Sequence, residues 1–456
     1  SITHPVVASK GMVATQHYLA SKVGEDILSQ GGNAYDAAVA VGFALAVVLP
    51  RARNSGGGGF TVKHDAKSHE AFSIFYIEKA PLKASRDMYL NDDGSVNSLR
   101  STVGYLAIGV PGSVYGMWEV HKKFGSMEWA ELLQPAIKLA SEGFVMSQYM
   151  TMTLNSRYKK LSQFPETKDI FYKDYPIEFN NVLIQADLAQ TLTLIAQNGV
   201  AGFYEGEVAD KIVNAMEKNG GLISHRDLKK YRPNWRKPLR SNYKGMNIIT
   251  MGPPSSGGIH LIQMLNILEN YNLKSFGHNN PRYVALLAEV MKFAYADRSK
   301  YLGDPDFYKV PVEELTSKEY ATAINQKLRL FEFMIPSPLP SSSIEPGEYM
   351  RKESEETTHY SIADQYGNII SNTYTLNSAF GSGVTIEGTG ILMNNEMDDF
   401  SASPGTPNQF GLLGGEANKI VPEKRPLSSM TPTIVLKGGE PYFATGSPGG
   451  SRIITS

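Results

Sequence analysis

Two alternating segments near the C-terminal end constrain the fold more than any other feature of this chain. Polar and apolar residues alternate over residues 357–363 and again over 368–376, and the turn-forming stretch 364–367 separates the two runs. A period of two is typical of strands that bury one face, and a short connection containing glycine is typical of a hairpin. The sequence therefore predicts two paired antiparallel strands, with Thr357 at the start of the first.

Thr357 can act as a nucleophile if the chain is cut immediately before it. A threonine hydroxyl reacts poorly until a base removes its proton, and a free α-amine on the same residue can be that base. Cleavage between Glu356 and Thr357 would free this amine, and the Pro- and Ser-rich stretch 335–343 upstream is typical of an extended linker. On these residues alone, ordinary strand packing of the Thr357-Thr358 pair is the simpler interpretation.

Composition excludes several classes of function. The 456 residues include 44 Lys and Arg against 45 Asp and Glu, so no overall charge favours nucleic acid or an anionic membrane. Cysteine is absent, which excludes disulfides, thiolate catalysis and Cys-based zinc sites. The nine histidines form neither a His-Glu-x-x-His nor a His-x-x-Glu-His arrangement. We therefore expect a small-molecule partner and neither a metal nor another cofactor.

An almost wholly apolar segment, residues 37–48, predicts a buried helix near the N-terminus. It is well below the roughly 20 residues that a membrane helix requires, and Asn33 is a suitable N-cap for a core helix. Strand-like runs occur at 72–77, 246–251 and 433–436, and helical segments lie between them. This mixture indicates a protein of mixed α and β structure without a membrane span.

A series of short motifs follows one order along nearly the whole chain. The motifs are 30–39 (QGGNAYDAAV), 56–60 (GGGGF), 109–113 (GVPGS), 235–238 (WRKP), 253–258 (PPSSGG), 295–298 (YADR), 357–361 (TTHYS), 394–400 (NNEMDDF), 424–430 (KRPLSSM) and 446–452 (GSPGGSR). A single one of them would be weak evidence, whereas the ordered set is specific. With this set the chain resembles the γ-glutamyltranspeptidase family, N-terminal nucleophile hydrolases that cleave themselves into two subunits.

The resemblance implies a fold, a division of the chain and an activity. The fold would be a four-layer αββα sandwich of the α+β class, with residues 1–356 as the large subunit and 357–456 in the small subunit, interwoven in one domain. Family members continue beyond the position of Ser456, so we expect the C-terminal part of the small subunit to be missing from this sequence. The activity would be transfer of a γ-glutamyl group from an amide such as glutathione to water or an amine, through an ester on Thr357, in a periplasmic or secreted enzyme.

The resemblance also implies roles for individual residues. Thr357 matches the nucleophile, Thr375 the threonine that supports it, and Gly449 and Gly450 the oxyanion hole, where the absence of Cβ atoms lets backbone N–H groups approach closely. The residues matched to recognition of the substrate head group are Asn377, Glu396 and Asp399 around the ammonium, and Ser428 and Ser429 on the α-carboxylate.

The chain departs from the family in its pocket. Ile77 stands where the family has an arginine that binds the α-carboxylate, and loss of this charge-assisted contact should weaken γ-glutamyl binding by roughly one to two decades. Either Arg51 or Arg53 partly replaces that guanidinium, or both are surface charges. In the segment 401–411, which resembles a lid, the usual tyrosine is Phe410, which lacks the hydroxyl that would latch the lid.

Two alternatives to γ-glutamyl transfer stay open at this point. An enzyme resembling the glutaryl or cephalosporin acylases would keep the threonine chemistry and change the acyl group. A non-catalytic homologue with impaired donor binding would explain Ile77, but it would not need the retained Thr357, Asp399, Ser428, Ser429, Gly449 and Gly450.

Overall fold

The computed structural model describes residues 4–52, 55–332 and 357–455, and its centre is a pair of β-sheets. The larger sheet has six antiparallel strands in the order β1-β9-β10-β2-β3-β6. Their bounds are β1 Gly11–Ala14, β9 Thr357–Asp364, β10 Ile369–Thr375, β2 Gly58–His64, β3 Ala71–Phe75 and β6 Asn234–Arg236. The strands β9 and β10 therefore lie between strands from the N-terminal part of the chain.

The second sheet has four antiparallel strands in the order β14-β13-β8-β7. Their bounds are β14 Glu440–Thr445, β13 Thr433–Lys437, β8 Met246–Thr250 and β7 Leu239–Tyr243. Buried apolar side chains from both sheets form one cluster, and the hydroxyl of Ser371 on β10 donates to the carbonyl of Thr445 on β14 at 3.1 Å. The two sheets therefore pack face to face, as in a sandwich.

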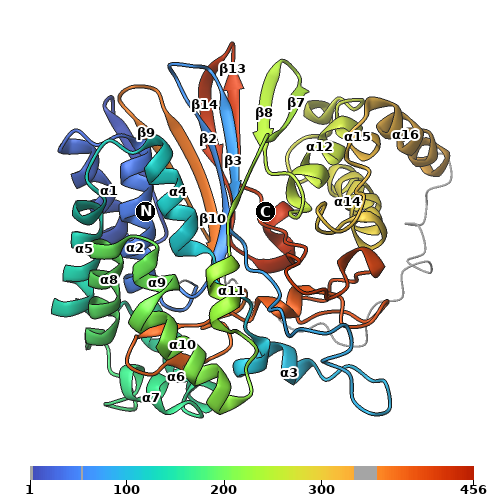
Figure 1. The fold of residues 1–456 in the computed structure, drawn as a ribbon. Helices are drawn as coiled ribbons and strands as arrows, with labels where there is room; N and C mark the ends of the chain where they lie inside the picture. Colours follow the sequence, from blue (N-terminus) through green and yellow to red (C-terminus); the bar gives the residue numbers. More distant parts are fainter. Residues whose placement is uncertain (1–3, 53–54, 333–356, 456) are drawn as a thin grey trace.

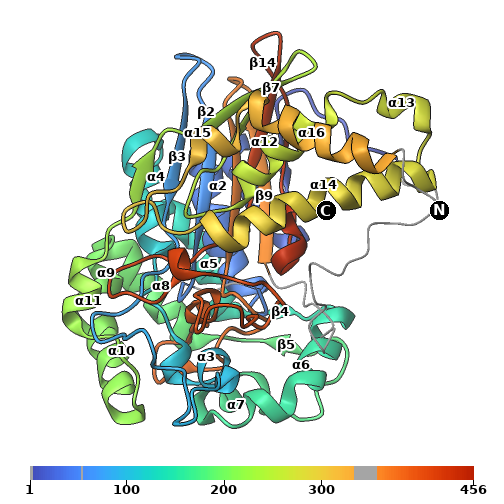
Figure 2. The same ribbon diagram turned by 90° about the vertical axis from the view of Figure 1, so that its right-hand side faces the viewer.

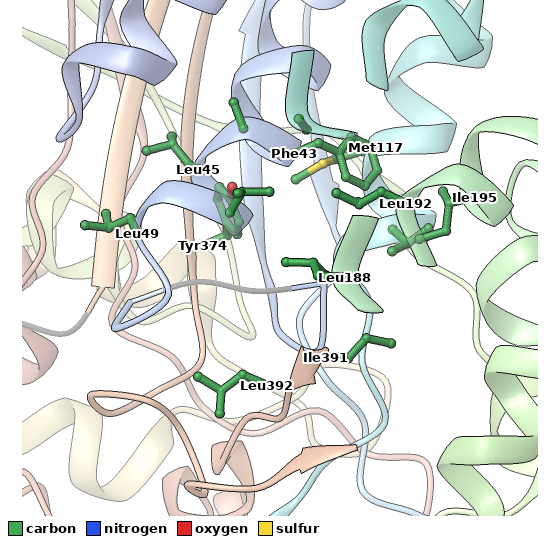
Figure 3. Close-up of a cluster of buried hydrophobic side chains, with 14 of the residues drawn as sticks. Phe43, Leu45, Leu49, Met117, Leu188, Leu192, Ile195, Tyr374, Ile391 and Leu392 are labelled. Atoms are coloured by element: carbon green, nitrogen blue, oxygen red, sulfur yellow. The ribbon is translucent and has the colours of Figure 1, made fainter. Parts of the chain in front are cut away.

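A helical layer covers the outer face of the six-stranded sheet, on the left in Figure 1. Its main helices are α1 Tyr18–Ser29, α2 Ala34–Val48, α4 Ser113–Phe124, α5 Trp129–Glu142 and α8 Ala186–Asn198. Every residue of α2 is buried, and Asn33 and Asp36 form a capping box at its start. Figure 3 shows Phe43 and Leu45 of α2 with Met117, Leu188 and Tyr374 in this core. The predicted core helix and its N-cap are confirmed.

A second helical layer covers the four-stranded sheet, and Figure 2 shows it from the outside. It consists of α12 Gly257–Leu268, α14 Pro281–Tyr301, α15 Val312–Leu315 and α16 Lys318–Glu332. The remaining elements are α3 Ser98–Thr102, α6 Gln148–Leu161, α7 Pro165–Phe171, α9 Ala201–Tyr204, α10 Gly206–Asn219, α11 His225–Lys230, α13 Leu273–Phe276, β4 Phe144–Val145, β5 Val182–Leu183, β11 Thr385–Ile386, β12 Ile391–Leu392, and the 3₁₀ helices η1 Tyr105–Ala107, η3 Glu396–Asp399, η4 Glu416–Asn418 and η5 Gly450–Thr455. The order helix, sheet, sheet, helix confirms the predicted α+β sandwich.

The sequence also predicted individual strands well. The hairpin forms with Thr375 opposite Thr357, and the runs at 246–251 and 433–436 correspond to β8 and β13. The strand predicted at 72–77 extends two residues too far, because β3 ends at Phe75. Lys79 then pairs with Val110 outside the sheet. No helix in the described ranges combines the length and apolar character needed to cross a bilayer.

Candidate active site

Two threonine hydroxyls meet at one end of the β9–β10 hairpin. Thr357 opens β9, Thr375 closes β10, and the ladder places them opposite each other. Both residues are buried, and Oγ1 of Thr357 donates to Oγ1 of Thr375 at 3.4 Å. The backbone N–H of Asn377 donates to the same Thr375 oxygen at 2.9 Å, so this oxygen is held in place. The predicted nucleophile therefore lies at a strand end beside a fixed hydroxyl.

Three asparagines hold the turn after β10 and the loops beside it: Asn377, which was matched to ammonium recognition, and Asn394 and Asn395, for which no role was predicted. Asn377 has a positive φ of 78°, and its Nδ2 donates to the carbonyl of Asn395 at 3.0 Å. The side chain of Asn394 joins the Gly56 and Gly109 loops, donating to their carbonyls at 2.7 and 2.9 Å. Asn394 and Asn395 belong to the 394–400 motif, and their burial was the feature that the sequence did not reveal.

Four carboxyl groups gather beside this turn: Glu78, and Glu396, Asp398 and Asp399 of η3. Burial and the neighbouring Asp398 raise the pKa of Asp399 to about 7, although Arg298 and hydrogen bonds from Asn377 and Asn408 oppose the rise. Burial also raises the pKa of Glu78 and of Glu396 well above the ordinary value, and each acts on the other groups. Such a cluster is poised to accept a cation.

Arg298 on α14 is a buried cation that acts on Asp399. Its Nε donates to Oγ of Ser256 at 3.3 Å and its Nη2 to the carbonyl of Leu427 at 3.4 Å. Burial lowers the pKa of Arg298, and the charge of Asp399 raises it. Arg298 ends the 295–298 motif, but no role was predicted for it, because nothing in the helical pattern marks it as buried.

The serine pair lies on the segment that Arg298 supports. The N–H of Ser428 donates to the carbonyl of Pro254 at 2.9 Å, and its Oγ accepts the N–H of Met430 at 3.2 Å. Oγ of Ser429 is buried and has no hydrogen-bond partner among the described residues. The pair therefore has hydroxyl groups that can donate to a ligand.

The glycine pair and the lid segment meet above the hairpin. Gly449 and Gly450 have φ values of 130° and 54°, and a Cβ built on Gly450 would lie 2.9 Å from Cδ1 of Phe410. Asn408, two residues before Phe410, donates from Nδ2 to Asp399 at 3.2 Å. At the start of the same glycine-rich turn, Gly446 lies against the ring of His359 on β9. The turn, the lid segment and the carboxyl cluster are therefore parts of one site.

The structure shows where Ile77 and Arg51 lie. The Ile77 side chain is fully buried in a cluster with Met430 and Ile453, beside the serine pair and η5. Arg51 is not a surface charge, because it is buried with its guanidinium carbon 4.9 Å from the centre of the Tyr149 ring. The alternative in which both arginines are surface charges is therefore wrong for Arg51. Stacking on an aromatic ring allows an arginine to be buried. Arg53 lies outside the described residues.

Clusters of metal-binding side chains were sought among the described residues. No group of three or more His, Asp and Glu side chains there could hold a metal ion. The expectation of no metal and no cofactor stays a prediction from the sequence.

Comparison with known proteins decides the family. Residues 20–456 match the family model for gamma-glutamyltranspeptidase. This chain belongs to the gamma-glutamyltranspeptidase family. It is 48% identical to a glutathione hydrolase proenzyme of Escherichia coli over 100% of this chain and 78% of that protein.

Solved structures agree with this assignment. The crystal structure of Helicobacter pylori gamma-glutamyltranspeptidase aligns with a TM-score of 0.71 at 44% identity, over 78% of this chain and 99% of that one. A cephalosporin acylase from Bacillus halodurans aligns with a TM-score of 0.82 at 28% identity, over 98% of this chain and 78% of that one. The solved structures that resemble this chain thus include a gamma-glutamyltranspeptidase and a cephalosporin acylase.

Proposed function

We propose that this family member is a self-processing threonine amidohydrolase and acyltransferase that acts on γ-glutamyl amides such as glutathione. Processing cuts the bond between Glu356 and Thr357 and divides the chain into a large subunit, 1–356, and a small subunit that begins at 357. The supporting observation is the buried Thr357 hydroxyl at the hairpin end, 3.4 Å from Thr375 Oγ1 and close to the glycine turn and the carboxyl cluster.

The proposed reaction has two steps. The new α-amine of Thr357 accepts the proton of its hydroxyl, and Oγ1 bonds to the γ-carbonyl carbon while the N–H groups of Gly449 and Gly450 stabilise the oxyanion. The carbon–nitrogen bond breaks, and the leaving amine takes the proton. Water or an amine then cleaves the ester and restores Thr357.

Head-group recognition would use the surrounding polar side chains. Asp399, with Asn377 and Glu396, would bind the α-ammonium, while the hydroxyls of Ser428 and Ser429 would donate to the α-carboxylate. Phe410 would close the pocket from above, since its ring lies against Gly450. By resemblance to its bacterial relatives, the protein would work in the periplasm or outside the cell as a complex of the two subunits.

The intact mass under denaturing conditions tests the proposal. Two species that separate at the Glu356–Thr357 bond, together with release of the amine from a γ-glutamyl anilide, are the expected result. A Thr357→Ala variant should remain one chain and be inactive, and Thr358→Ala, which changes the adjacent buried threonine, serves as the matched control for processing. A single uncut wild-type chain without activity would contradict the proposal.

The acylase alternative has a specific observation in its favour, the likeness to the cephalosporin acylase. It predicts faster turnover of glutaryl anilides than of γ-glutamyl anilides. The charges of the site argue against it, because a glutaryl group brings a carboxylate and no ammonium to a cluster of carboxyl groups.

A further inference from the structure

The charged groups near the two threonines are unevenly distributed. The carboxyls of Glu78, Glu396 and Asp399 form one interacting group. Glu78 is fully buried, and neither of its carboxyl oxygens has a hydrogen-bond partner in the described ranges; the same holds for Oε2 of Glu396. Unpartnered buried carboxyls are costly, and a bound cation would relieve that cost.

Among the described residues, no cation acts strongly on Glu78 or Glu396. The neighbours that shift the pKa of Glu78 and Glu396 are carboxyls, not cations. Arg298 acts on Asp399, but two of its donors already bond to Ser256 and to the Leu427 carbonyl. The raised pKa values mean that Glu78 and Glu396 hold their protons more tightly than usual, and an incoming ammonium would stabilise their ionised forms.

The surroundings of the serine pair provide few groups that could bind a carboxylate. The free hydroxyl of Ser429 can donate one hydrogen bond, but Ile77, Met430 and Ile453 form an apolar cluster beside it. The guanidinium of Arg51 lies against Tyr149 on α6. An anion placed at the serine pair would lose hydration, gain hydroxyl donors and feel the nearby carboxyls.

We infer that this site selects the acyl donor by its ammonium group and gains little from an α-carboxylate, so that 4-aminobutyryl amides, which keep the ammonium and lack the carboxylate, are substrates. The inference rests on the proposed function and uses the same chemistry. Thr357 Oγ1 bonds to the acyl carbon, the amide carbon–nitrogen bond breaks with the proton on the leaving amine, and water releases 4-aminobutyrate.

Three p-nitroanilides test the inference at pH 8: γ-glutamyl, 4-aminobutyryl and glutaryl, each with an enzyme-free blank for spontaneous cyclisation. We expect kcat/KM for the γ-glutamyl compound to exceed that for the 4-aminobutyryl compound by less than about tenfold, which is less than one charge-assisted contact provides. The glutaryl compound should be at least about 100-fold poorer than either, because it lacks the ammonium.

An Ile77→Arg variant supplies the missing cation, and Ile77→Leu is its apolar control. The arginine should raise the γ-glutamyl to 4-aminobutyryl ratio by about 10- to 100-fold, whereas leucine should leave the ratio as it is. If the arginine variant does not fold, the wild-type ratio decides alone.

The outcomes separate the inference from the function on which it rests. A γ-glutamyl preference above about tenfold overturns the inference and leaves the proposed function standing. In that case, a lower γ-glutamyl preference in Arg53→Ala would indicate that Arg53 supplies the positive charge for the α-carboxylate. Preference for the glutaryl compound overturns the inference in favour of the acylase alternative. Absence of turnover of all three by a correctly cut protein overturns the proposed function and the inference together.

Discussion

Replacing Asp399 with asparagine should stabilise the protein at neutral and alkaline pH while it removes donor binding. In the folded protein the pKa of Asp399 is about 7, whereas an aspartate in an unfolded chain has a pKa of about 3.9. Between these values the folded state holds a proton that the unfolded state has released. The free energy of unfolding therefore falls as pH rises from about 4 to about 7 and is constant above that.

The magnitude follows from the difference of about three pH units. At about 1.36 kcal/mol per unit the cost of ionising Asp399 would reach about 4 kcal/mol. About 1.5 kcal/mol of that cost is already present at pH 5, about one unit above the unfolded-state pKa. Because the side chain is partly exposed, water screens part of the rest, so about 2 kcal/mol falls between pH 5 and pH 8. Asparagine keeps an oxygen that can accept from Asn377 and Asn408 and carries no charge to be ionised.

Urea unfolding at pH 5 and pH 8 measures the effect. A Thr357→Ala background keeps one uncut chain, and Asp92→Asn, at an exposed turn, is the matched control. Relative to its parent, Asp399→Asn should gain about 2 kcal/mol more in the free energy of unfolding at pH 8 than at pH 5. The control should show no such difference. An equal gain at both pH values, or a loss at pH 8, would refute the reasoning.

Loss of the Asp399 proton should raise the activity, although it lowers the free energy of unfolding. A carboxylate binds an ammonium better than a carboxylic acid does, so kcat/KM for a γ-glutamyl anilide should rise with pH through about 7 and then level off. In processed Asp399→Asn the residual kcat/KM should be low and should lack this rise. A wild-type profile that is flat between pH 5.5 and 8 (about two units around the pKa) would contradict the assignment.

Three further substitutions test separate parts of the structure. Thr375→Val removes the oxygen that accepts from Thr357 and Asn377, and should lower kcat by about 10- to 100-fold in a steady-state assay, with Thr375→Ser restoring most of it. Gly450→Ala places a Cβ against Phe410 at a positive φ and should lower kcat about 100-fold with a smaller change in KM; an unchanged kcat would remove Gly450 from the oxyanion hole. Asn33→Ala breaks the capping box of α2 and should cost about 1 kcal/mol in urea unfolding, without a change in KM.

Local patterns in the sequence determined much of the fold. The alternation around 357–376 predicted the hairpin and the place of Thr357 at its end, because side chains on a strand alternate between its faces. The apolar run at 37–48 and Asn33 predicted a buried, capped helix for a similar local reason. The ordered motifs indicated the family, and through it the four layers.

The tertiary structure alone decided the electrostatics of the site. Glu78, Asp399 and Arg298 come from three distant segments, and their mutual charges depend on burial and distance, which no local pattern records. The sequence also left open that Arg51 is a surface charge, whereas its guanidinium is buried against the Tyr149 ring. Short-range periodicity fixes which face of an element is apolar, whereas pKa values and unpartnered polar atoms arise only when the chain brings remote residues together.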